Sequence, residues 1–471
     1  MELSLIKNEL DTALSNLNQW IKQESLETPW HHIKGVTTTA LYPQPIGVVL
    51  IVSPWNYPLL LSLQPLVGAI AAGCCVCIKP SSVTCNTSHL LATLIPRYLD
   101  NRCYRVVEGG HDVSDALLEL KWDKIFFTGS ASVGRSIYQK AAKFLTPVIL
   151  ELGGKSPAIV DSTADLKITC RRLTYGKFMN LGQTCIAPDY VLVDETVAVP
   201  FAEMMMQTIR EFYGEDPKKS EDLCRMASKK HYDRLVEILQ KDAQNEEATI
   251  SETATMENKE TAQLSSDATA GVVQQPSISA SASSSSSDMP SSDTVMSGLS
   301  RLFNPSRHQS GHIVIYGGGV DPEDLWIEPT LVTTTMTSTT RLMQEEIFGP
   351  VLPIISVKHE TFLDDCISFI NKRERPLCVY LFTSDSDSKN RILEGTTSGA
   401  TIVNECLIQL SAESLPFGGV GESGTGCYHG KKTFDAFTHH KAYMDKAKIM
   451  DLDVRYPPFT EKKLSSLKKI M

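Results

Sequence analysis

The chain has 471 residues, of which 42% are hydrophobic and 21% charged, and its formal net charge at pH 7 is -10. This length exceeds one ordinary hydrophobic core, so we expect two or more domains in a soluble globular protein. The negative charge and the lack of a long basic run argue against general nucleic-acid binding. The N-terminus lacks the basic start and apolar core of a signal peptide, and no apolar stretch is long enough for a confident membrane span. We therefore expect a cytoplasmic protein whose cysteines are reduced.

Strand and helix patterns alternate along the first part of the chain. Residues 4–22 have the apolar spacing of an amphipathic helix, and the β-branched run at 45–54 indicates a buried parallel strand. A helical stretch follows at 61–73. Further strand patterns, separated by helical stretches, occur at 74–80, 104–110, 124–130 and 147–154. This alternation predicts a doubly wound α/β domain up to about residue 153.

A second α/β pattern begins after this domain and is interrupted once. Strands are predicted at 157–160 and 190–194, and a helix at 200–214. Residues 241–311 are rich in serine and have little to bury, which predicts a disordered insertion. A tolerated surface insertion is favoured over a phosphorylated regulatory loop. The strand and helix patterns resume at residue 312.

One cysteine stands in a setting that suits a reactive thiol. Cys185 follows Gly182, Gln183 and Thr184 in the stretch "KFMNLGQTCIAPDY". A thiol reacts as the thiolate, which needs a polar environment, and a nearby glycine lets backbone amides approach the sulfur. Taken alone, the pattern favours an ordinary core cysteine over a nucleophile.

Two polar residues fall where α/β enzymes build their sites. Glu151 ends an apolar strand, so it should lie at the carboxyl edge of the sheet as a candidate general base. Asn56 is bracketed by two prolines and suits a rigid hydrogen-bond donor for an oxyanion. A capping or solvated acid and an ordinary asparagine turn are the alternative interpretations of these two residues.

Several segments suit a dinucleotide. Gly129 and Gly134 lie in a strand–turn–helix pattern, where a helix N-terminus favours phosphate, although the pattern is not GxGxxG. Lys79 follows a buried strand and can reach a ribose or a phosphate. Glu346 and Phe348 add a carboxylate and an aromatic ring before a Gly-Pro turn.

Cys74 and Cys77 have the C-x-x-C spacing of redox and metal sites. No second pair and no histidine cluster accompanies them, and both fall in a predicted strand. We therefore predict core packing for both residues and no metal site.

These motifs occur together in the order and spacing of one enzyme family. The segments "PWNYP", "KPS", "FTGSASVG", "LELGGKSP", "GQTC", "EEIFGPV" and "LPFGGVGESGTGCYHGKK" resemble the aldehyde dehydrogenase superfamily. Longer stretches, among them "GKFMNLGQTCIAPDY" and "PVILELGGKSPAIVD", are similar to the class-three and fatty aldehyde dehydrogenase branch. The resemblance covers roughly residues 40–240 and 312–440.

The resemblance implies a role for each motif residue. Cys185 would attack the aldehyde to form a thiohemiacetal and then a thioester, Asn56 would hold the oxyanion, and Glu151 would activate the water that releases the acid. The cofactor would be NAD or NADP. Lys79 and the turn at Gly129 and Ser130 would hold its adenosine half, Glu346 would bind the nicotinamide ribose, and Phe348 would pack beside it. The complete set of expected cofactor-binding residues is Lys79, Ser82, Gly129, Ser130, Gly134, Glu346 and Phe348.

Three features depart from the family pattern. Ser82 stands where relatives often carry glutamate, and a neutral side chain there does not repel a 2′-phosphate, so we expect NADP to be accepted as well as NAD. The chain begins late relative to the N-terminal helical segment of the family, so we expect a truncated N-terminus. No apolar helix and no terminal cysteine for prenylation follows "RYPPFTEKKLSSLKKIM", so membrane contact should be peripheral at most.

The resemblance also divides the chain into domains. We assign residues 1–153 to the dinucleotide-binding domain, with about 24–45 in a small β oligomerisation arm. Residues 154–415 would form the α/β catalytic domain, including the serine-rich insertion. Residues 416–445 would bridge the subunits of a homodimer, and 446–471 would be a tail.

We therefore predict NAD(P)-dependent oxidation of aldehydes to carboxylic acids, with medium- to long-chain aliphatic or aromatic aldehydes as substrates. A CoA-acylating or semialdehyde-specific dehydrogenase is one alternative, and Glu151 argues against it because a thioester meant for CoA does not need that base. A non-catalytic binding or structural protein with the same fold is the other. The complete set of Cys185, Glu151 and Asn56 argues against that alternative.

Overall fold

The computed structural model describes residues 1–27, 37–240, 312–448 and 453–470. The predicted insertion at 241–311 lies outside these residues. The chain divides into two compact units. Unit 1 consists of Met1–Glu151, Leu410–Gly418 and Thr425–Met471, and unit 2 of Leu152–Gln409 and Gly419–Gly424.

Five parallel strands in the order β7-β6-β3-β4-β5 form the core of unit 1. Their apolar, β-branched sequences fit strands that are buried on both faces, and Val49, Leu50 and Ile51 are fully buried. The strands are β3 (Val48–Val52), β4 (Cys75–Lys79), β5 (Tyr104–Val106), β6 (Lys124–Thr128) and β7 (Val148–Glu151), with the short β17 (Gly424–Thr425) beside β7. Cys74 and Cys77 are buried, which confirms their predicted core packing.

Helices of unit 1 connect and cover these strands. The segment predicted at 4–22 forms α1, which packs against α2 and α13. The helices are α1 (Glu2–Trp20), α2 (Leu60–Ala72), α3 (Cys85–Tyr98), α4 (His111–Leu118), α5 (Ala131–Ala142), α13 (Lys431–Ala436) and α14 (Glu461–Ile470).

A buried carboxylate joins α1 to the rest of unit 1. Glu9 is 2% exposed. Its Oε2 accepts hydrogen bonds from Gln64 Nε2 at 3.2 Å and from Gly430 N at 3.1 Å, and its Oε1 accepts one from Thr433 Oγ1 at 2.6 Å. These bonds satisfy the buried carboxylate and connect the first helix to segments from both ends of the chain.

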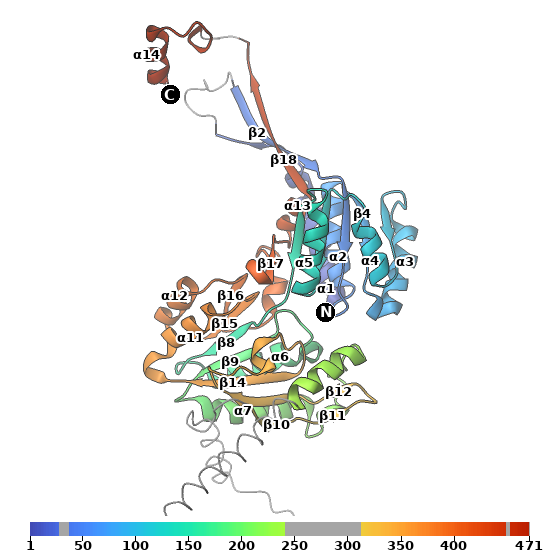
Figure 1. The fold of residues 1–471 in the computed structure, drawn as a ribbon, viewed down its shortest axis with the longest axis vertical. Coiled ribbons are helices and arrows are strands. Elements are labelled where there is room, and N and C mark those ends of the chain that lie inside the picture. The colour runs from blue at the N-terminus through green and yellow to red at the C-terminus, as the bar shows by residue number, and fades with distance from the viewer. Residues whose placement is uncertain (28–36, 241–311, 449–452, 471) are drawn as a thin grey trace, which may run out of the picture. The chain divides into compact units, whose positions relative to one another are not determined.

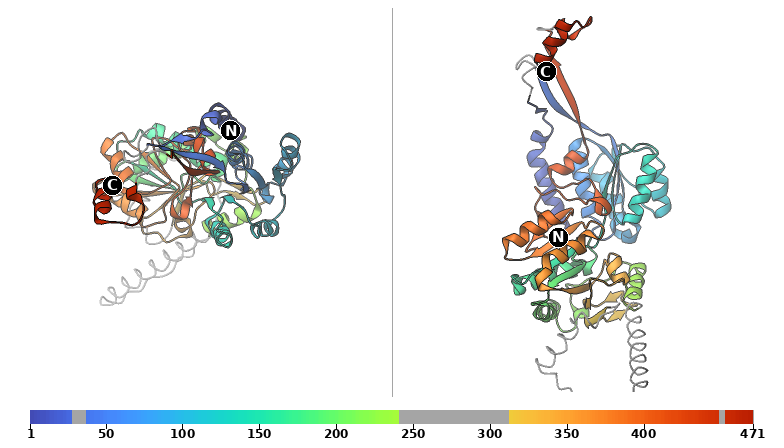
Figure 2. Two further views of the ribbon diagram at one scale, coloured as in Figure 1. Left: turned by 90° about the horizontal axis from the view of Figure 1, so that it is seen from above. Right: turned by 60° about the vertical axis from the view of Figure 1, so that its left-hand side comes forward.

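A long antiparallel pair extends from the parallel sheet of unit 1 (Figures 1 and 2). β2 (Thr37–Pro45) pairs with β18 (Thr438–Lys446) in a register that runs from Thr37 opposite Lys446 to Pro45 opposite Thr438. The short β1 (Glu24–Ser25) pairs with the other edge of β2. Most of β18 is exposed. An exposed strand edge of this length is available for pairing with another chain.

Unit 2 is built on a seven-stranded sheet in the order β10-β13-β14-β9-β8-β15-β16. All neighbouring strands are parallel except β10, which is antiparallel to β13. The strands are β8 (Pro157–Val160), β9 (Tyr190–Asp194), β10 (Ile313–Tyr316), β13 (Thr330–Thr334), β14 (Val351–Val357), β15 (Cys378–Phe382) and β16 (Ala400–Val403), with the small pair β11 (Val320–Asp321) and β12 (Trp326–Ile327) outside this sheet. The parallel sheets of both units confirm the predicted α/β fold class.

The helices of unit 2 follow the predicted alternation with strands. They are α6 (Leu166–Phe178), α7 (Ala198–Tyr213), α10 (Arg341–Gln344), α11 (Phe362–Asn371), α12 (Ser386–Gly395) and a helix over residues 229–240. Among the described helices, none combines the length and the apolar character needed to cross a membrane. The same described ranges hold no cluster of three or more His, Cys, Asp or Glu side chains that could bind a metal ion.

Candidate active site

The loop that carries Cys185 begins with an unusual backbone. After α6 ends at Phe178, Asn180, Leu181 and Gly182 have φ values of 51°, 53° and 73°. Two of these three left-handed residues carry side chains, a conformation that proteins keep where the surroundings impose it. A Cβ atom on Gly182 would lie 2.3 Å from the carbonyl oxygen of Gly349, so this position requires glycine.

Hydrogen bonds on both sides of Cys185 fix this loop. The buried Gln183 amide donates to the carbonyl oxygens of Asn180 and Arg225, each at 3.1 Å, and accepts from Ala227 N at 2.9 Å. On the other side, Tyr380 Oη donates to Ile186 O at 2.6 Å. The loop is therefore anchored one residue after Cys185 and two residues before it.

The exposure of Cys185 distinguishes it from the core cysteines. Its thiol is partly exposed and forms no disulfide, whereas six other cysteines are buried. Burial raises the pKa of Cys77 to about 11 and that of Cys378 to about 12, which keeps those thiols protonated and unreactive. Those two cysteines thus behave as small core hydrophobes, and Cys185 does not share their environment.

Glu151 is the last residue of β7, at the predicted carboxyl edge of the unit 1 sheet. It is 2% exposed, and neither carboxylate oxygen has a hydrogen-bond partner among the described residues. Burial raises its pKa well above the ordinary value. A buried acid without a partner is costly to the fold, so its retention points to a functional group.

Asn56 follows β3 at the same edge of the sheet in unit 1 and is half-buried. The turn that holds it is tied down where it enters α2. Glu2 Oε2 accepts hydrogen bonds from Leu59 N at 3.0 Å and Leu60 N at 2.8 Å. A carboxylate at this helix N-terminus satisfies amides that would otherwise lack partners. The first helix thereby supports the Asn56 turn.

The expected adenosine-binding residues also follow strands of this sheet. Lys79 ends β4, and its buried Nζ donates to Pro80 O at 2.9 Å. Burial lowers the pKa of this lysine. Ser82 begins a short 3-10 helix (Ser82–Thr84) and is exposed. A neutral, exposed Ser82 close in sequence to a cation suits either cofactor.

The turn between β6 and α5 fits a phosphate group. A Cβ atom on Gly129 would lie 2.5 Å from Phe127 Cζ, so a side chain at this turn would have to displace the Phe127 ring. Ser130 is the N-cap of α5 but makes no side-chain capping bond, and its hydroxyl lies 3.1 Å from that of Ser132. Gly134 is buried inside the helix. A close backbone and a helix N-terminus are the groups that bind a dinucleotide phosphate.

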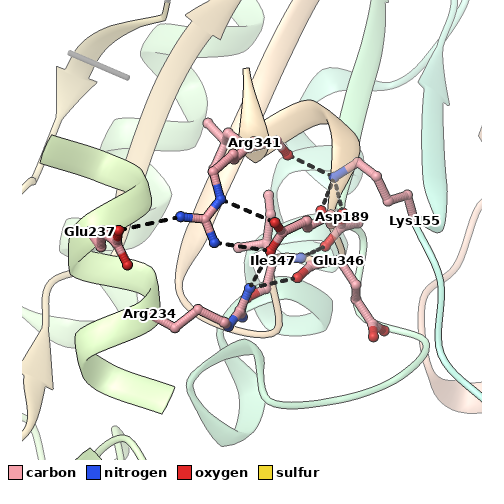
Figure 3. Close-up of polar contacts among 9 residues, drawn as sticks. Lys155, Asp189, Arg234, Glu237, Arg341, Glu346 and Ile347 are labelled. Carbon is pink, nitrogen blue, oxygen red and sulfur yellow. Dashed lines mark hydrogen bonds and ion pairs between the residues drawn. The ribbon is translucent and has the colours of Figure 1, made fainter. Parts of the chain in front are cut away.

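A network of charged residues in unit 2 holds the loop of Glu346 and Phe348 (Figure 3). Lys155 pairs with Asp189 and donates to the carbonyl oxygens of Leu342 and Glu345 at 2.8 and 2.9 Å. Asp189 in turn accepts from Ile347 N at 3.0 Å. The two side chains of this pair thus fix the backbone on both sides of Glu346.

Arg234, from the helix over residues 229–240, holds the same loop from another direction (Figure 3). It donates to the carbonyl oxygens of Glu346 at 3.2 Å and Ile347 at 2.5 Å. Phe348, next in the chain, has a φ of 50°. Backbone strain of this kind persists only where surrounding contacts impose it.

The Glu346 side chain itself turns toward the glycines that follow Glu151 in sequence. Its Oε1 accepts a hydrogen bond from Gly154 N at 3.0 Å. Burial, followed by the nearby Asp189 carboxylate, raises the pKa of Glu346 to about 8. Lys177, fully buried in the last turn of α6, has no hydrogen-bond partner for its Nζ among the described residues, and burial lowers its pKa to about 8.

The structure therefore groups the predicted residues within each unit. Unit 1 carries Asn56, Lys79, Ser82, Gly129, Ser130, Gly134 and Glu151, and unit 2 carries Cys185, Glu346 and Phe348. Sequence reasoning gave no role to Lys155, Asp189, Arg234 or Gln183, which position the two loops of unit 2. Lys155, Asp189 and Gln183 lie inside the quoted motifs "ELGGKSP" and "GQTCIAPDY", and that position was the available signal.

A parallel α/β sheet with motif residues at its carboxyl edge, as in unit 1, is typical of nucleotide-binding α/β proteins. The sequence model of the aldehyde dehydrogenase family matches residues 3–286 and 299–443. The chain is 38% identical over 462 residues to aldehyde dehydrogenase family 3 comG of Dictyostelium discoideum, covering 98% of this chain and 82% of that protein. It is 36% identical to the "aldehyde dehydrogenase, dimeric NADP-preferring" of Canis lupus familiaris, covering 97% of this chain and 84% of that protein.

A solved structure gives the same result. The substrate-bound state of Staphylococcus aureus AldH matches with a TM-score of 0.79 and 35% identity, over 99% of this chain and 85% of that chain. The chain belongs to the aldehyde dehydrogenase family, as its motifs predicted. It is an enzyme that oxidises aldehydes with NAD or NADP.

Proposed function

We propose that Cys185 is the nucleophile of this aldehyde dehydrogenase, that Asn56 donates to the oxyanion and that Glu151 activates the hydrolytic water. The observation that carries this assignment is the buried Glu151 carboxyl group, which has no hydrogen-bond partner among the described residues. Its raised pKa supports a general base, because a carboxylate with high proton affinity takes a proton from water more readily.

The steps follow from these groups. The Cys185 thiolate adds to the aldehyde carbon, and the resulting oxyanion accepts hydrogen bonds from the Asn56 side-chain amide and the Cys185 backbone amide. When bound, NAD or NADP supplies the hydride acceptor. Cys185 is then left as a thioester. Glu151 takes a proton from the attacking water, and Cys185 leaves as the carboxylic acid forms.

Replacement of Glu151 by glutamine tests this order of steps. The Glu151→Gln variant should release about one equivalent of NAD(P)H per active site in a rapid burst and then turn over slowly, because acylation survives and hydrolysis does not. Cys185→Ser should give neither phase. A Glu151→Gln enzyme with unchanged steady-state turnover would contradict the role of Glu151. If added CoA restored turnover of this variant, the natural acceptor would be CoA rather than water.

The residues expected to contact the cofactor remain part of this proposal. Lys79, Ser82, Gly129, Ser130 and Gly134 would hold the adenosine half, and Glu346 and Phe348 the nicotinamide ribose. The glycine turn before α5 supports the first group. The absence of a carboxylate at Ser82 supports acceptance of NADP beside NAD. The canine relative is described as NADP-preferring.

We further propose a homodimer that acts on medium- to long-chain aliphatic or aromatic aldehydes in the cytoplasm, with membrane contact at most peripheral. The exposed β18 edge supports pairing with a second copy, and the canine relative is described as dimeric. Sedimentation of the purified chain tests the dimer. Rates across an aldehyde chain-length series test the substrate class.

A further inference from the structure

The carboxyl group of Glu346 lies against a pair of glycines. Gly154 N donates to its Oε1 at 3.0 Å. A Cβ atom on Gly153 would lie 2.3 Å from Oε2 and 2.4 Å from Oε1, far inside van der Waals contact. Any side chain at residue 153 would therefore displace the Glu346 carboxyl group, and the observed arrangement requires glycine there.

Two cations near Glu346, Lys155 and Arg234, are already engaged elsewhere, whereas the buried Lys177 Nζ has no hydrogen-bond partner among the described residues. Lys155 binds Asp189 and two carbonyl oxygens, and Arg234 donates to the carbonyl oxygens of Glu346 and Ile347. The titratable and charged groups that act on Glu346 are Asp189, Lys155, Arg234 and, from α6, Lys177. Glu346 receives one backbone N–H from Gly154, and its pKa of about 8 keeps the carboxyl group protonated at neutral pH.

This arrangement conflicts with the proposed use of Glu346. The strongest contact with the two hydroxyls of a ribose is made by an ionised carboxylate that offers both oxygens as acceptors. Against the glycines, Oε1 accepts from Gly154 N and the group retains its proton. The same side chain cannot satisfy both sets of partners at once.

We propose that Gly153 and Gly154 hold the Glu346 carboxyl group in a resting position, which it leaves as a carboxylate when the ribose of NAD or NADP binds. This inference rests on the proposed function, in which Glu346 contacts that ribose. Gly153 is then a positioning residue, since it leaves the space that the Glu346 carboxyl group occupies when no cofactor is bound.

A linkage between cofactor binding and pH follows. In the resting position the carboxyl group is protonated below about pH 8, and binding requires it to lose that proton. Lower pH stabilises the resting form, so affinity falls as pH falls. Between pH 9 and pH 6, NAD affinity should fall about 100-fold, which is one power of ten for each pH unit below the pKa.

The predicted pH dependence of NAD affinity is tested by calorimetric titration of the full chain with NAD, without aldehyde, from pH 6 to pH 9. Gly153→Ala should expel the carboxyl group, restore an ordinary pKa near 4.3, and make the dissociation constant nearly the same from pH 6 to pH 9. Gly154→Ala is the matched control, because its Cβ would meet only Leu377 N and Pro376 Cα at 3.9 Å. It should keep the parent's pH dependence.

The outcomes distinguish the resting position of Glu346 from its proposed contact with the nicotinamide ribose. A merely structural role for Gly153 would weaken binding equally at every pH and leave the pH dependence intact, and that result overturns the resting position. Glu346→Gln should bind NAD weakly and without this pH dependence. If it binds like the parent at every pH, the ribose role of Glu346 fails as well.

A measurement on the unaltered chain keeps the test decisive if Gly153→Ala does not fold. Titrations at pH 6.5 in buffers with different ionisation enthalpies give the number of protons released on binding. The resting position requires about one proton released for each NAD bound. No net release would overturn it.

Discussion

Gly182 lies so close to Gly349 that a Cβ atom on Gly182 would stand 2.3 Å from the Gly349 carbonyl oxygen. This approach brings the loop of Cys185 against the loop of Glu346 and Phe348 within unit 2. Neither loop can take up its position if either backbone is pushed away. The geometry of the proposed nucleophile therefore depends on a residue without a side chain.

Alanine at residue 182 should disable the enzyme. The added methyl group displaces the Cys185 loop, and a displacement of about 1 Å at a reacting atom can cost about 100-fold in rate, so kcat/KM should fall by at least that factor. Gly214→Ala is the control, because Gly214 has a φ of 81° but no atom within 4 Å of its Cβ position. It should lose about 1 kcal/mol of stability and keep its activity. Equal activity losses in the two variants would contradict this account.

Removal of the Asp189 carboxylate should destabilise unit 2. The Lys155 and Asp189 side chains are 11% and 4% exposed, so Asp189→Ala leaves a buried cation unpaired. We expect a loss of about 3–5 kcal/mol in the free energy of unfolding, measured by urea denaturation. A Lys155→Met/Asp189→Leu double variant should recover much of this loss, because it buries no charge. If the double variant is as unstable as Asp189→Ala, loss of packing rather than an unpaired charge is responsible.

A carboxylate at residue 82 should shift the cofactor preference. Ser82→Glu is expected to raise the KM for NADP at least 10-fold through repulsion of the 2′-phosphate, and to leave the KM for NAD equal or lower. Ser82→Gln has nearly the same size without the charge and should leave the ratio of the two KM values near that of the parent. Unchanged NAD and NADP kinetics in Ser82→Glu would place Ser82 away from the adenosine ribose.

The buried Glu9 should contribute strongly to stability. Glu9→Ala leaves Gln64, Gly430 N and Thr433 without their acceptor, and we expect a loss of about 3 kcal/mol. Asp11→Ala, on the same helix, removes an exposed pair with Lys7 and should change stability by less than about 0.5 kcal/mol. Thermal unfolding of both variants distinguishes them, and equal midpoints would mean that Glu9 is dispensable.

The His359 side chain should make stability depend on pH. Its hydrogen bond to Asp194, 2.7 Å between Nδ1 and Oδ2, raises its pKa above the ordinary value. Because the folded pKa is the higher one, the contribution is fully present below about pH 6.5 and is lost as pH rises through the raised pKa. The difference in melting temperature between the parent and His359→Gln should therefore be largest near pH 5.5 and smaller at pH 9. A difference independent of pH would exclude protonation of His359 as the cause.

Sequence patterns predicted the elements that depend on local apolar periodicity. The continuous apolar run of β3 is typical of a strand that is buried on both faces of a sheet. The apolar spacing of α1 is typical of a helix that is buried on one face. The strand ends then placed Asn56, Lys79 and Glu151 at one sheet edge. Asparagine tolerates the left-handed conformation found at Asn180, but the same conformation at Leu181 was not predictable, because leucine does not favour it.

Contacts between residues far apart in the sequence could not be predicted either. No role was predicted for the glycines at 153 and 154, because the Glu346 side chain that contacts them comes from a segment almost two hundred residues later. Lys155 and Asp189 form an ion pair. The sequence did not indicate this pair, because each residue is an ordinary polar residue within its own motif. The expected functions of the residues at 241–311 stay predictions, because that segment lies outside the described residues.

The pairing of β2 with β18 has a consequence for synthesis of the chain. Unit 1 cannot be completed until its last strand has left the ribosome, whereas the main part of unit 2, Leu152–Gln409, lies between the first two of the three parts of unit 1. At 5–20 residues per second, the stretch between residues 151 and 410 takes roughly 15 to 50 s. During that time β2 has only the two-residue β1 as a partner, and α2 lacks α13. A nascent chain halted before residue 438 should therefore expose an unpaired strand edge, and this interval is when the protein needs a chaperone most.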